Sequence, residues 1–284
     1  MAIDTSQTHA MTCDVEDYFQ VSAFDGIIPQ SRWKEVECRI PRNVDKALQL
    51  FADNDAKATF FTLGWVAQHY PDVIRRIVSE GHELASHGMS HRRVWTQTAD
   101  EFREDAGTAR KLLEDTGGVA VVGYRAASWS IDGRTPWAHQ VLSEVGYQYS
   151  SSVYPVSHDH YGVPAAPRSP HKISGTDVVE IPPSTARFLG RNIPVSGGGY
   201  FRLFPLSLSQ YFIRRHQEIE SYPYTFYFHP WELDPNQPRV ENVSTKSRFR
   251  HYLNLDKFEK RFSALLRSHK WGRMDEIYLG GEEW

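Results

Sequence analysis

The feature that most constrains the fold of this chain is the alternation of strand-like and helix-like segments over its first 150 residues. Ala58–Leu63 is rich in β-branched and aromatic residues and ends at Gly64, which is typical of a strand. Pro71–Glu80 places its apolar residues on one helical face and ends at Gly81. Along the whole chain, strands are expected at 58–63, 82–85, 119–124 and 224–228, and helices at 43–51, 71–80, 98–115, 207–220 and 255–266. The alternation predicts an α/β fold in which outer helices connect parallel strands.

Polar residues follow three of the expected strands. Asp14 follows a short run that could form a first strand, His87 follows the strand at 82–85, and Arg125 follows the strand at 119–124. In barrels built from alternating strands and helices, the chemistry takes place at the carboxyl ends of the strands. We therefore expect these three residues on one functional face.

Two histidines lie four residues apart in Ser86–His91, directly after an expected strand. With one carboxylate from the segment Cys13–Asp17, His87 and His91 would form a three-ligand metal site. Such a site leaves a fourth position open, which favours hydrolysis over a structural metal. The spacing alone is a weak signal, because a histidine pair is often just two polar loop residues. The spacer Gly88–Ser90 lacks the glutamate of zincin proteases, which excludes that class.

Composition argues against two classes of partner. The 284 residues carry 32 basic and 35 acidic side chains, and the net charge of −3 gives no electrostatic footprint for nucleic acid or an anionic membrane. No apolar run approaches the length of a membrane span, and the polar start Met1–Met11 has no signal-peptide core. We therefore expect a cytoplasmic protein. Cys13 and Cys38 form no metal-binding or redox motif, and reduced thiols are expected.

The second half of the chain has a different sequence pattern. Residues 158–171 contain three prolines, which predicts a long loop. The glycine-rich segment Val195–Arg202 lacks the lysine and hydroxyl residue that end a P-loop, so a tight turn lining a substrate cleft is favoured over phosphate binding. No linker divides the chain. This predicts a single domain over residues 1–284, with a C-terminal extension after about residue 235.

Taken together, these segments resemble a known family. Five ordered motifs make the chain similar to the NodB-homology polysaccharide deacetylases, carbohydrate esterase family 4. The matching segments are Thr12–Asp14, Ala58–Phe61 with Gly81–His91, Tyr124–Trp129, Tyr149–Ser152 and Phe226–His229. Asp14–Phe19 and Gly197–Arg202 further resemble a subgroup linked to bacterial exopolysaccharide and exosortase gene clusters. The resemblance implies a distorted (β/α) barrel with about seven parallel strands, in agreement with the alternation.

The resemblance also implies a divalent metal. The implied ligands are Glu16, His87 and His91. Zinc is the expected ion, and cobalt, nickel and manganese are alternatives. Val15 replaces the second aspartate of the family's Thr-Phe-Asp-Asp motif and cannot bind metal. Glu16 is preferred as the carboxylate ligand because residues two apart on a strand point to the same side, and Asp17 is its rival.

The other motif residues take their roles from the same resemblance. Asp14 would be the general base, Arg125 would pair with Asp14 and orient it, and His229 would protonate the leaving amine. Each of them also has a structural interpretation, as a strand-end cap, a salt bridge or a structural histidine. The candidates for stacking on sugar rings are Trp129, Tyr154, Tyr200 and Trp231, and for each of them core packing is an equal expectation.

The implied function is removal of N-acetyl groups from an amino-sugar polysaccharide or oligosaccharide, of an exopolysaccharide or peptidoglycan-like kind. One alternative is a small-substrate amidohydrolase of the same superfamily, which a deep closed pocket would favour. The other is a catalytically inactive carbohydrate-binding protein. Val15 and the altered third motif, which lacks the family's proline after Arg125, favour this second alternative, whereas retention of Asp14, Arg125, both motif histidines and His229 argues against it.

Overall fold

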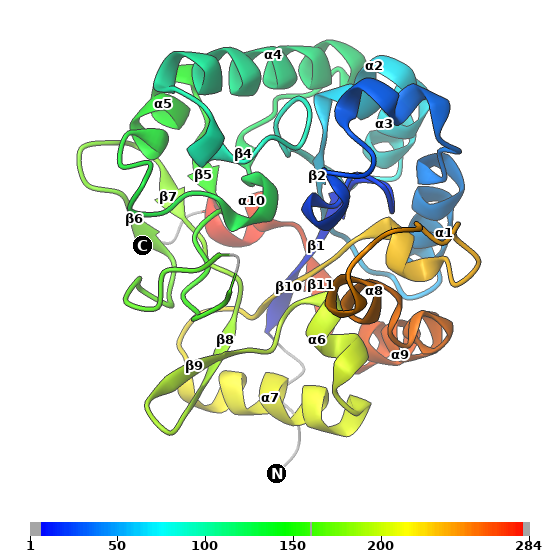
Figure 1. Cartoon of the computed structure of the whole chain (residues 1–284). Coiled ribbons are helices and arrows are strands. Elements are labelled where there is room, and N and C mark those ends of the chain that lie inside the picture. The colour runs from blue at the N-terminus through cyan, green and yellow to red at the C-terminus, as the bar shows by residue number, and fades with distance from the viewer. Residues whose placement is uncertain (1–6, 160, 281–284) are drawn as a thin grey trace.

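The computed structural model describes residues 7–159 and 161–280. At its centre a curled, mostly parallel sheet forms a half-barrel (Figure 1). The strands of this sheet are β1 (Thr8–Val15), β2 (Thr59–Thr62), β3 (Glu83–Ser86), β4 (Gly123–Tyr124), β5 (Tyr149–Ser150), β6 (His171–Lys172), β7 (Val179–Glu180), β10 (Thr225–Phe228) and β11 (Lys270–Gly272). Within the described residues, seven strands follow one another in parallel pairs in the order β10-β1-β2-β3-β4-β5-β7, and β11 also pairs in parallel with β1. This confirms the predicted α/β fold, a distorted barrel with about seven parallel strands.

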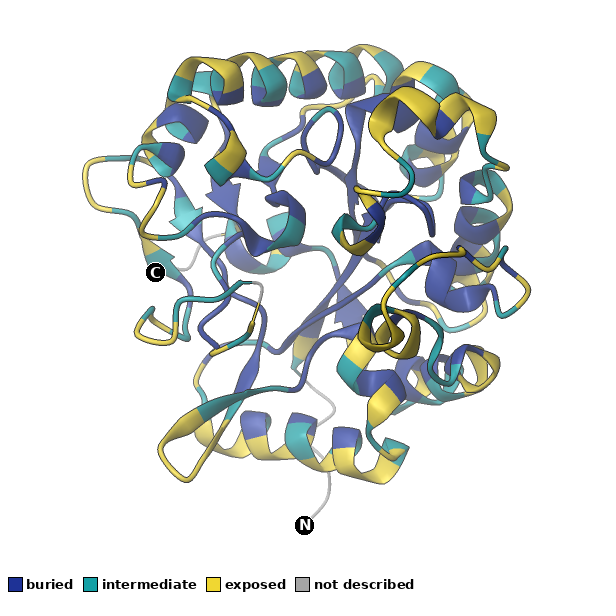
Figure 2. Ribbon diagram, viewed as in Figure 1, coloured by how far each residue is buried: buried dark blue, intermediate teal, exposed yellow. Residues whose placement is uncertain are grey.

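Most helices lie around the outside of the sheet, namely α1 (Ile40–Ala52), α2 (Gly64–His69), α3 (Pro71–Ser79), α4 (Ala99–Gly117), α5 (Ala138–Val145), α6 (Gly198–Leu203), α7 (Leu206–Ile219), α8 (Thr245–Tyr252) and α9 (Leu255–Ser268). The short α10 (Met274–Tyr278) lies at the centre of the view in Figure 1 and packs with Ala10, Phe61 and Ala85 in a second core cluster. Figure 2 shows that most of the sheet is buried, whereas α4 and α7 are exposed on their outer faces. The helix predicted at 98–115 starts at a capping box between Thr98 and Glu101 and ends at Gly118, which has a φ of 68°.

The register of β1 with its neighbours brings the predicted site residues together. Cys13 pairs with Phe228, so the next residues along these two strands are Asp14 and His229. On the other side, β1 pairs with β2 and β2 with β3, which ends at Ser86 just before His87. Because these strands are parallel, their carboxyl ends meet at one edge of the sheet.

Residues after 235 pack back onto the barrel. The strand β11 pairs in parallel with the start of β1, and α9 covers β10 from outside. Phe262 of α9 is fully buried, and its ring lies 4.5 Å from that of Phe228 and 5.9 Å from that of Phe51. The C-terminal region therefore contributes to the main core, while its predicted status as an extension of a single domain stays a prediction.

Two expectations from the sequence are wrong in detail. The strand expected at 119–124 contains only Gly123–Tyr124 in the structure: residues 119–122 are not part of a strand, and Val119 is exposed. The glycine-rich segment is not a turn at the cleft: its residues from Gly198 onward form α6, which packs against β10 and α9. Glycine was interpreted as a turn signal, whereas here it permits close packing of a helix.

Two further expectations concern the cysteines and membranes. Cys13 and Cys38 are both free thiols, as expected. Among the helices of residues 7–159 and 161–280, none combines the length and the apolar character needed to cross a membrane. Residues 1–6 of the polar start lie outside the described residues.

Replacement of a buried ring in the C-terminal region tests its contribution to the core. We expect Phe262→Ala to lower the free energy of unfolding by about 3–5 kcal/mol, because it leaves a cavity between α9 and β10. Phe249→Ala is the control, since that ring is 57% exposed, and it should change stability by less than about 0.5 kcal/mol. Denaturant unfolding measures both. Equal effects of the two substitutions would contradict the packing described.

Candidate active site and metal centre

A cleft of about 570 Å³ lies at the carboxyl ends of the parallel strands. Its floor contains residues from three different strand ends and from the loop after β3, including Asp14, Glu16, His87, His91 and His229. The sequence predicted Asp14, His87 and Arg125 at one functional face, and the family resemblance added Glu16, His91 and His229; the structure brings these residues together. Arg125 lies directly beneath the floor, since it contacts Asp14.

Glu16, His87 and His91 form a buried cluster. One ligand atom of each lies within 4.8 Å of the others. The loop that carries the histidines turns sharply, because Gly88 has a φ of 78° and His91 a φ of 56°. A non-glycine residue in the left-handed region costs about 1–3 kcal/mol, and such strain persists where the surroundings enforce it, often at functional sites.

The residues of this cluster fit a divalent metal ion. The Nδ1 atom of His87 lies 2.8 Å from the carbonyl oxygen of Arg125, so this nitrogen donates and Nε2 is left as the ligand atom. The Oε2 atom of Glu16 is buried without a hydrogen-bond donor, 2.8 Å from Nε2 of His91. Two electron-rich atoms this close need a proton or a cation between them. A divalent ion would satisfy both, and three ligands of this type suit zinc.

The charge state of Glu16 also suits metal binding. Burial alone would raise the pKa of its carboxyl, but the imidazoles of His91 and His229 outweigh burial and lower the pKa to about 2. Glu16 is therefore a carboxylate at neutral pH. Burial lowers the pKa of His87 to about 4, so its imidazole is neutral and its lone pair is available.

Asp17, the rival ligand, faces a different part of the chain. Its Oδ1 atom accepts a hydrogen bond from the backbone N–H of Tyr18 at 2.8 Å, and its Oδ2 atom accepts one from the backbone N–H of Arg39. Burial raises the pKa of Asp17 to about 6. Asp17 thus fixes the turn after β1, and it is Glu16 that the structure groups with the two imidazoles.

Asp14 is held by a buried ion pair. The Oδ1 atom of Asp14 accepts a hydrogen bond from Arg125 at 2.6 Å, and both side chains are almost completely buried. Arg125 also donates to the hydroxyl of Thr12 at 2.8 Å and to that of Ser151 at 2.9 Å, and its guanidinium lies 4.0 Å from the ring centre of Phe61. Breaking a buried pair of this kind by removing one partner costs about 3–5 kcal/mol.

His229 lies beside both carboxylates. Its Nε2 atom is 3.5 Å from Oε1 of Glu16 and 4.0 Å from Oδ2 of Asp14. Burial lowers the pKa of His229, but the carboxylates of Glu16, Glu232 and Asp14 outweigh burial and raise the pKa to about 9. At neutral pH the ring therefore carries a proton that it can donate toward the cleft.

The four aromatic candidates for sugar stacking have different environments. Trp129 lines the cleft and packs on Tyr227, 4.9 Å between ring centres. Trp231 also lines it, but its ring is stacked between those of His229 and His251. Tyr154 is fully buried and presents no ring face to a sugar.

Tyr200 does not line the cleft, and its ring packs near that of Phe204. Sequence reasoning missed the half-buried Trp95 and Tyr161, which do line it. Neither belongs to a recognised motif, so no signal in the sequence pointed to them. Sequence reasoning also missed Glu232 behind His229, although the spacing of a capping box could have suggested it.

Two family models match successive parts of the chain. Residues 29–150 match the family model described as polysaccharide deacetylase. This match covers less than half of the chain, so it is a likeness to that family over this segment. Residues 151–279 match a second model, described as a domain of unknown function (DUF3473). The chain is therefore matched by two models in succession. Asp14 and Glu16 precede the first of them.

Two curated relatives illustrate how far the likeness extends. A peptidoglycan deacetylase of Helicobacter pylori is 28% identical over 110 residues, which are 39% of this chain and 36% of that protein. A chitooligosaccharide deacetylase of Bradyrhizobium is 26% identical over 184 residues, 56% of this chain and 80% of that protein. The match thus spans little more than a third of the length of the first of these relatives.

Solved structures share the fold. A crystal structure from Mycobacterium smegmatis, assigned to the polysaccharide deacetylases, has a TM-score of 0.59 at 17% identity and covers 98% of this chain and 91% of that one. A pseudoenzyme of the CE4 family from Bacillus anthracis has a TM-score of 0.50 at 12% identity and covers 97% of this chain and 66% of that one. The fold therefore occurs both in proteins assigned as deacetylases and in a pseudoenzyme, so activity has to be argued from the site.

Removal of the histidine pair tests the metal centre. Titration with zinc chloride, followed by calorimetry and elemental analysis, should give one ion per chain. The double substitution His87→Ala and His91→Ala should weaken zinc binding by more than about 100-fold, because loss of even an outer partner of a metal ligand costs 10- to 100-fold. His69→Ala with His171→Ala is the matched control, since neither residue lines the cleft. Equal zinc binding by both double variants would contradict the site.

Proposed function

We propose that this chain is a metal-dependent hydrolase that removes N-acetyl groups from amino-sugar polysaccharides or oligosaccharides. The observation that carries the proposal is the arrangement of Glu16, His87 and His91 beside the Asp14–Arg125 pair and His229 at one cleft floor. A possible metal site, a carboxylate and a protonated imidazole within a few ångströms are what amide hydrolysis requires.

Glu16, His87 and His91 would hold the metal, for which we propose zinc. Cobalt, nickel and manganese also accept imidazole and carboxylate ligands. When bound, a divalent ion supplies Lewis acidity toward the acetyl carbonyl and makes water more acidic. The remaining chemistry is the work of the chain's own residues.

Asp14 is proposed as the general base. Its Oδ1 atom is held by Arg125 at 2.6 Å, which fixes the orientation of the carboxylate. The other oxygen, Oδ2, is directed toward the cleft side and lies 4.0 Å from His229. This oxygen would accept a proton from the attacking water, and Arg125 would stabilise the carboxylate form of the base.

His229 is proposed as the general acid. In the metal-free site burial lowers its pKa, but the carboxylates of Glu16, Glu232 and Asp14 outweigh burial and raise the pKa to about 9, and Glu232 and Asp14 are not among the proposed metal ligands. The Nε2 atom faces the two carboxylates of the cleft floor. From this position the ring would protonate the amine nitrogen as the C–N bond breaks, which amides require because an unprotonated amine anion is a poor leaving group.

The substrate is proposed from the cleft and the relatives together. Trp129, Trp95 and Tyr161 line a cleft of about 570 Å³ with aromatic surface that suits sugar rings. The relatives are named for peptidoglycan and chitooligosaccharides. The resemblance of Asp14–Phe19 and Gly197–Arg202 to an exopolysaccharide-associated subgroup supports an exopolysaccharide substrate. Cytoplasmic location remains a prediction of the sequence.

The inactive carbohydrate-binding alternative rested on Val15 and on the altered third motif after Arg125. In the structure the Val15 side chain is fully buried in the main core, and Glu16 is the residue grouped with the histidines. The substitution therefore leaves a complete candidate ligand set. This observation favours an enzyme over a binding protein built on the same fold.

Substitution of the proposed general base, Asp14, distinguishes a deacetylase from a carbohydrate-binding protein. Asp14→Asn should lower the rate of acetate release from zinc-loaded protein about 100- to 10,000-fold, because general base catalysis contributes that much. Binding of N-acetylated chito-oligomers should change by less than about threefold. Asp45→Asn, at a surface carboxylate paired with Arg76, should keep full activity. Binding without acetate release by the unsubstituted protein would establish the binding-protein alternative instead.

A further inference from the structure

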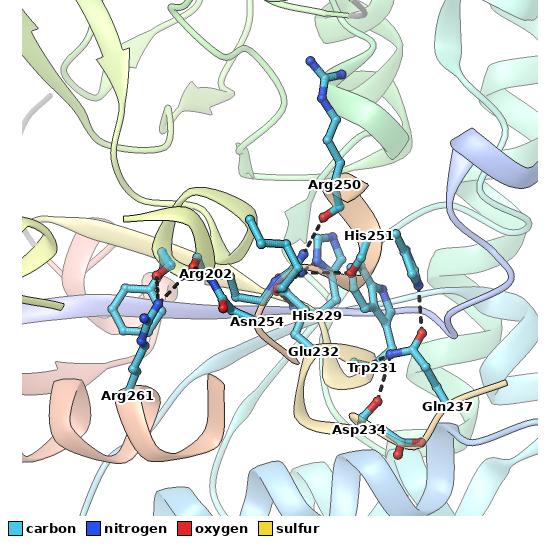
Figure 3. Close-up of polar contacts among 12 residues, drawn as sticks. Arg202, His229, Trp231, Glu232, Asp234, Gln237, Arg250, His251, Asn254 and Arg261 are labelled. Carbon is cyan, nitrogen blue, oxygen red and sulfur yellow. Dashed lines mark hydrogen bonds and ion pairs between the residues drawn. The ribbon is translucent and has the colours of Figure 1, made fainter. Parts of the chain in front are cut away.

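A buried ion pair lies directly behind His229 (Figure 3). The Nε atom of Arg202 donates to Oε1 of Glu232 at 2.7 Å, and neither side chain is more than 2% exposed. Arg202 comes from α6, in the glycine-rich segment, whereas Glu232 lies three residues after His229. Neither residue lines the cleft, so the pair does not contact a substrate there.

Glu232 contacts His229 in two ways. Its Oε2 atom accepts the backbone N–H of His229 at 3.0 Å and lies 3.3 Å from Nδ1 of the ring. The Nδ1–H group therefore donates to a carboxylate, and the opposite nitrogen, Nε2, is left to face the cleft. This contact fixes both the rotation of the ring and the nitrogen that is available for proton transfer.

Arg202 ties Glu232 to the region after residue 235. Its guanidinium donates to three backbone carbonyls at the end of α8, those of Arg250, His251 and Leu253, at 2.7–3.2 Å. In return, the carbonyl of Arg202 accepts hydrogen bonds from Asn254 and Arg261, both at 2.9 Å. The last carbonyls of a helix lack partners within the helix, so they are available to bind a guanidinium, and these three hydrogen bonds hold that of Arg202 in place.

The glycines of the same segment make room for the pair. A Cβ atom at Gly198 would lie only 1.9 Å from Oε2 of Glu232, the oxygen that contacts His229. A Cβ atom at Gly197 would lie 2.4 Å from the ring of Tyr227. At Gly199, in contrast, a Cβ atom would meet nothing within 4 Å. The requirement for glycine is therefore local and differs between adjacent positions.

We infer that Glu232 is a positioning residue for His229, held in place by Arg202 and accommodated by Gly198, so that the C-terminal region controls the general acid. This inference rests on the proposed function. It also gives a role to the Gly-Gly-Gly-Tyr-Phe-Arg segment, which lies outside the cleft. Gly198 leaves space for the Glu232 carboxylate and Arg202 binds it, and this carboxylate orients the general acid.

The proton transfer balances without another reactant. As the C–N bond of the tetrahedral adduct breaks, its electron pair goes to the nitrogen, which takes the proton from Nε2 of His229. The ring becomes neutral and keeps its Nδ1–H, which remains bonded to Glu232. If the ring were rotated, its Nε2–H group would no longer face the cleft, and the transfer would be lost while water attack on the carbonyl was still possible.

Two substrates distinguish a loss of proton donation by His229 from a general loss of catalytic activity. An N-acetylated chito-oligomer has an amine leaving group that needs a proton, whereas 4-nitrophenyl acetate has a phenolate that leaves without one. For zinc-loaded Gly198→Ala we expect kcat on the amide to fall at least 30-fold with KM within twofold, and the rate on the ester to stay within threefold. Glu232→Gln should behave in the same way. Gly199→Ala, the matched control, should equal the unsubstituted protein on both substrates.

Equal losses on the amide and the ester, or no loss on the amide, would overturn the inference. Glu232→Asp, which keeps a charge beside Arg202, replaces Glu232→Gln if that variant does not fold. Should the unsubstituted protein release no acetate from any amide, the proposed function fails, and the ring nitrogens of His229 are then followed by 15N NMR in metal-free protein. A protonated Nδ1 that is lost in Gly198→Ala or Glu232→Gln would support the positioning role. An unchanged ring spectrum in the folded variants would overturn it.

Discussion

The parallel pairing of β1 with β2 and β10 is the constraint on which the rest of the site depends. Seven of its eight residues are buried, and it pairs with three strands. A shift of one residue in a strand moves every side chain to the opposite face. The register therefore decides that Asp14 reaches Arg125 across the sheet and that His229 arrives beside it. The buried Asp14–Arg125 pair in turn penalises any other register, because each charge would then lack its partner.

Much of this arrangement could be predicted from the sequence because it depends on patterns that are local. The helices α1, α3, α4, α7 and α9 were recognisable from apolar periodicity and capping signals, and β2, β3 and β10 from β-branched and aromatic runs. The grouping of Asp14, His87 and Arg125 at one face followed from parallel topology alone. The preference for Glu16 over Asp17 followed from strand periodicity, and the structure groups Glu16 with the histidines.

What the sequence could not predict depends on packing between distant segments. Whether a tyrosine fills the core or faces a sugar is decided by its neighbours: Tyr154 lies between Trp129 and Tyr161 and is fully buried. The glycine-rich segment suggested a turn, yet its role depends on Glu232, which is 34 residues away in sequence from Gly198. No periodicity or motif spacing signals a contact of that kind.

The central claim is that Glu16, His87 and His91 hold a divalent ion at the cleft floor. Anomalous diffraction at the zinc edge, from crystals grown with zinc, tests it most directly. The account predicts one strong peak about 2.0–2.2 Å from an oxygen of Glu16 and from one nitrogen of each histidine. A peak bound by other residues, or no peak in the cleft at saturating zinc, would contradict the account.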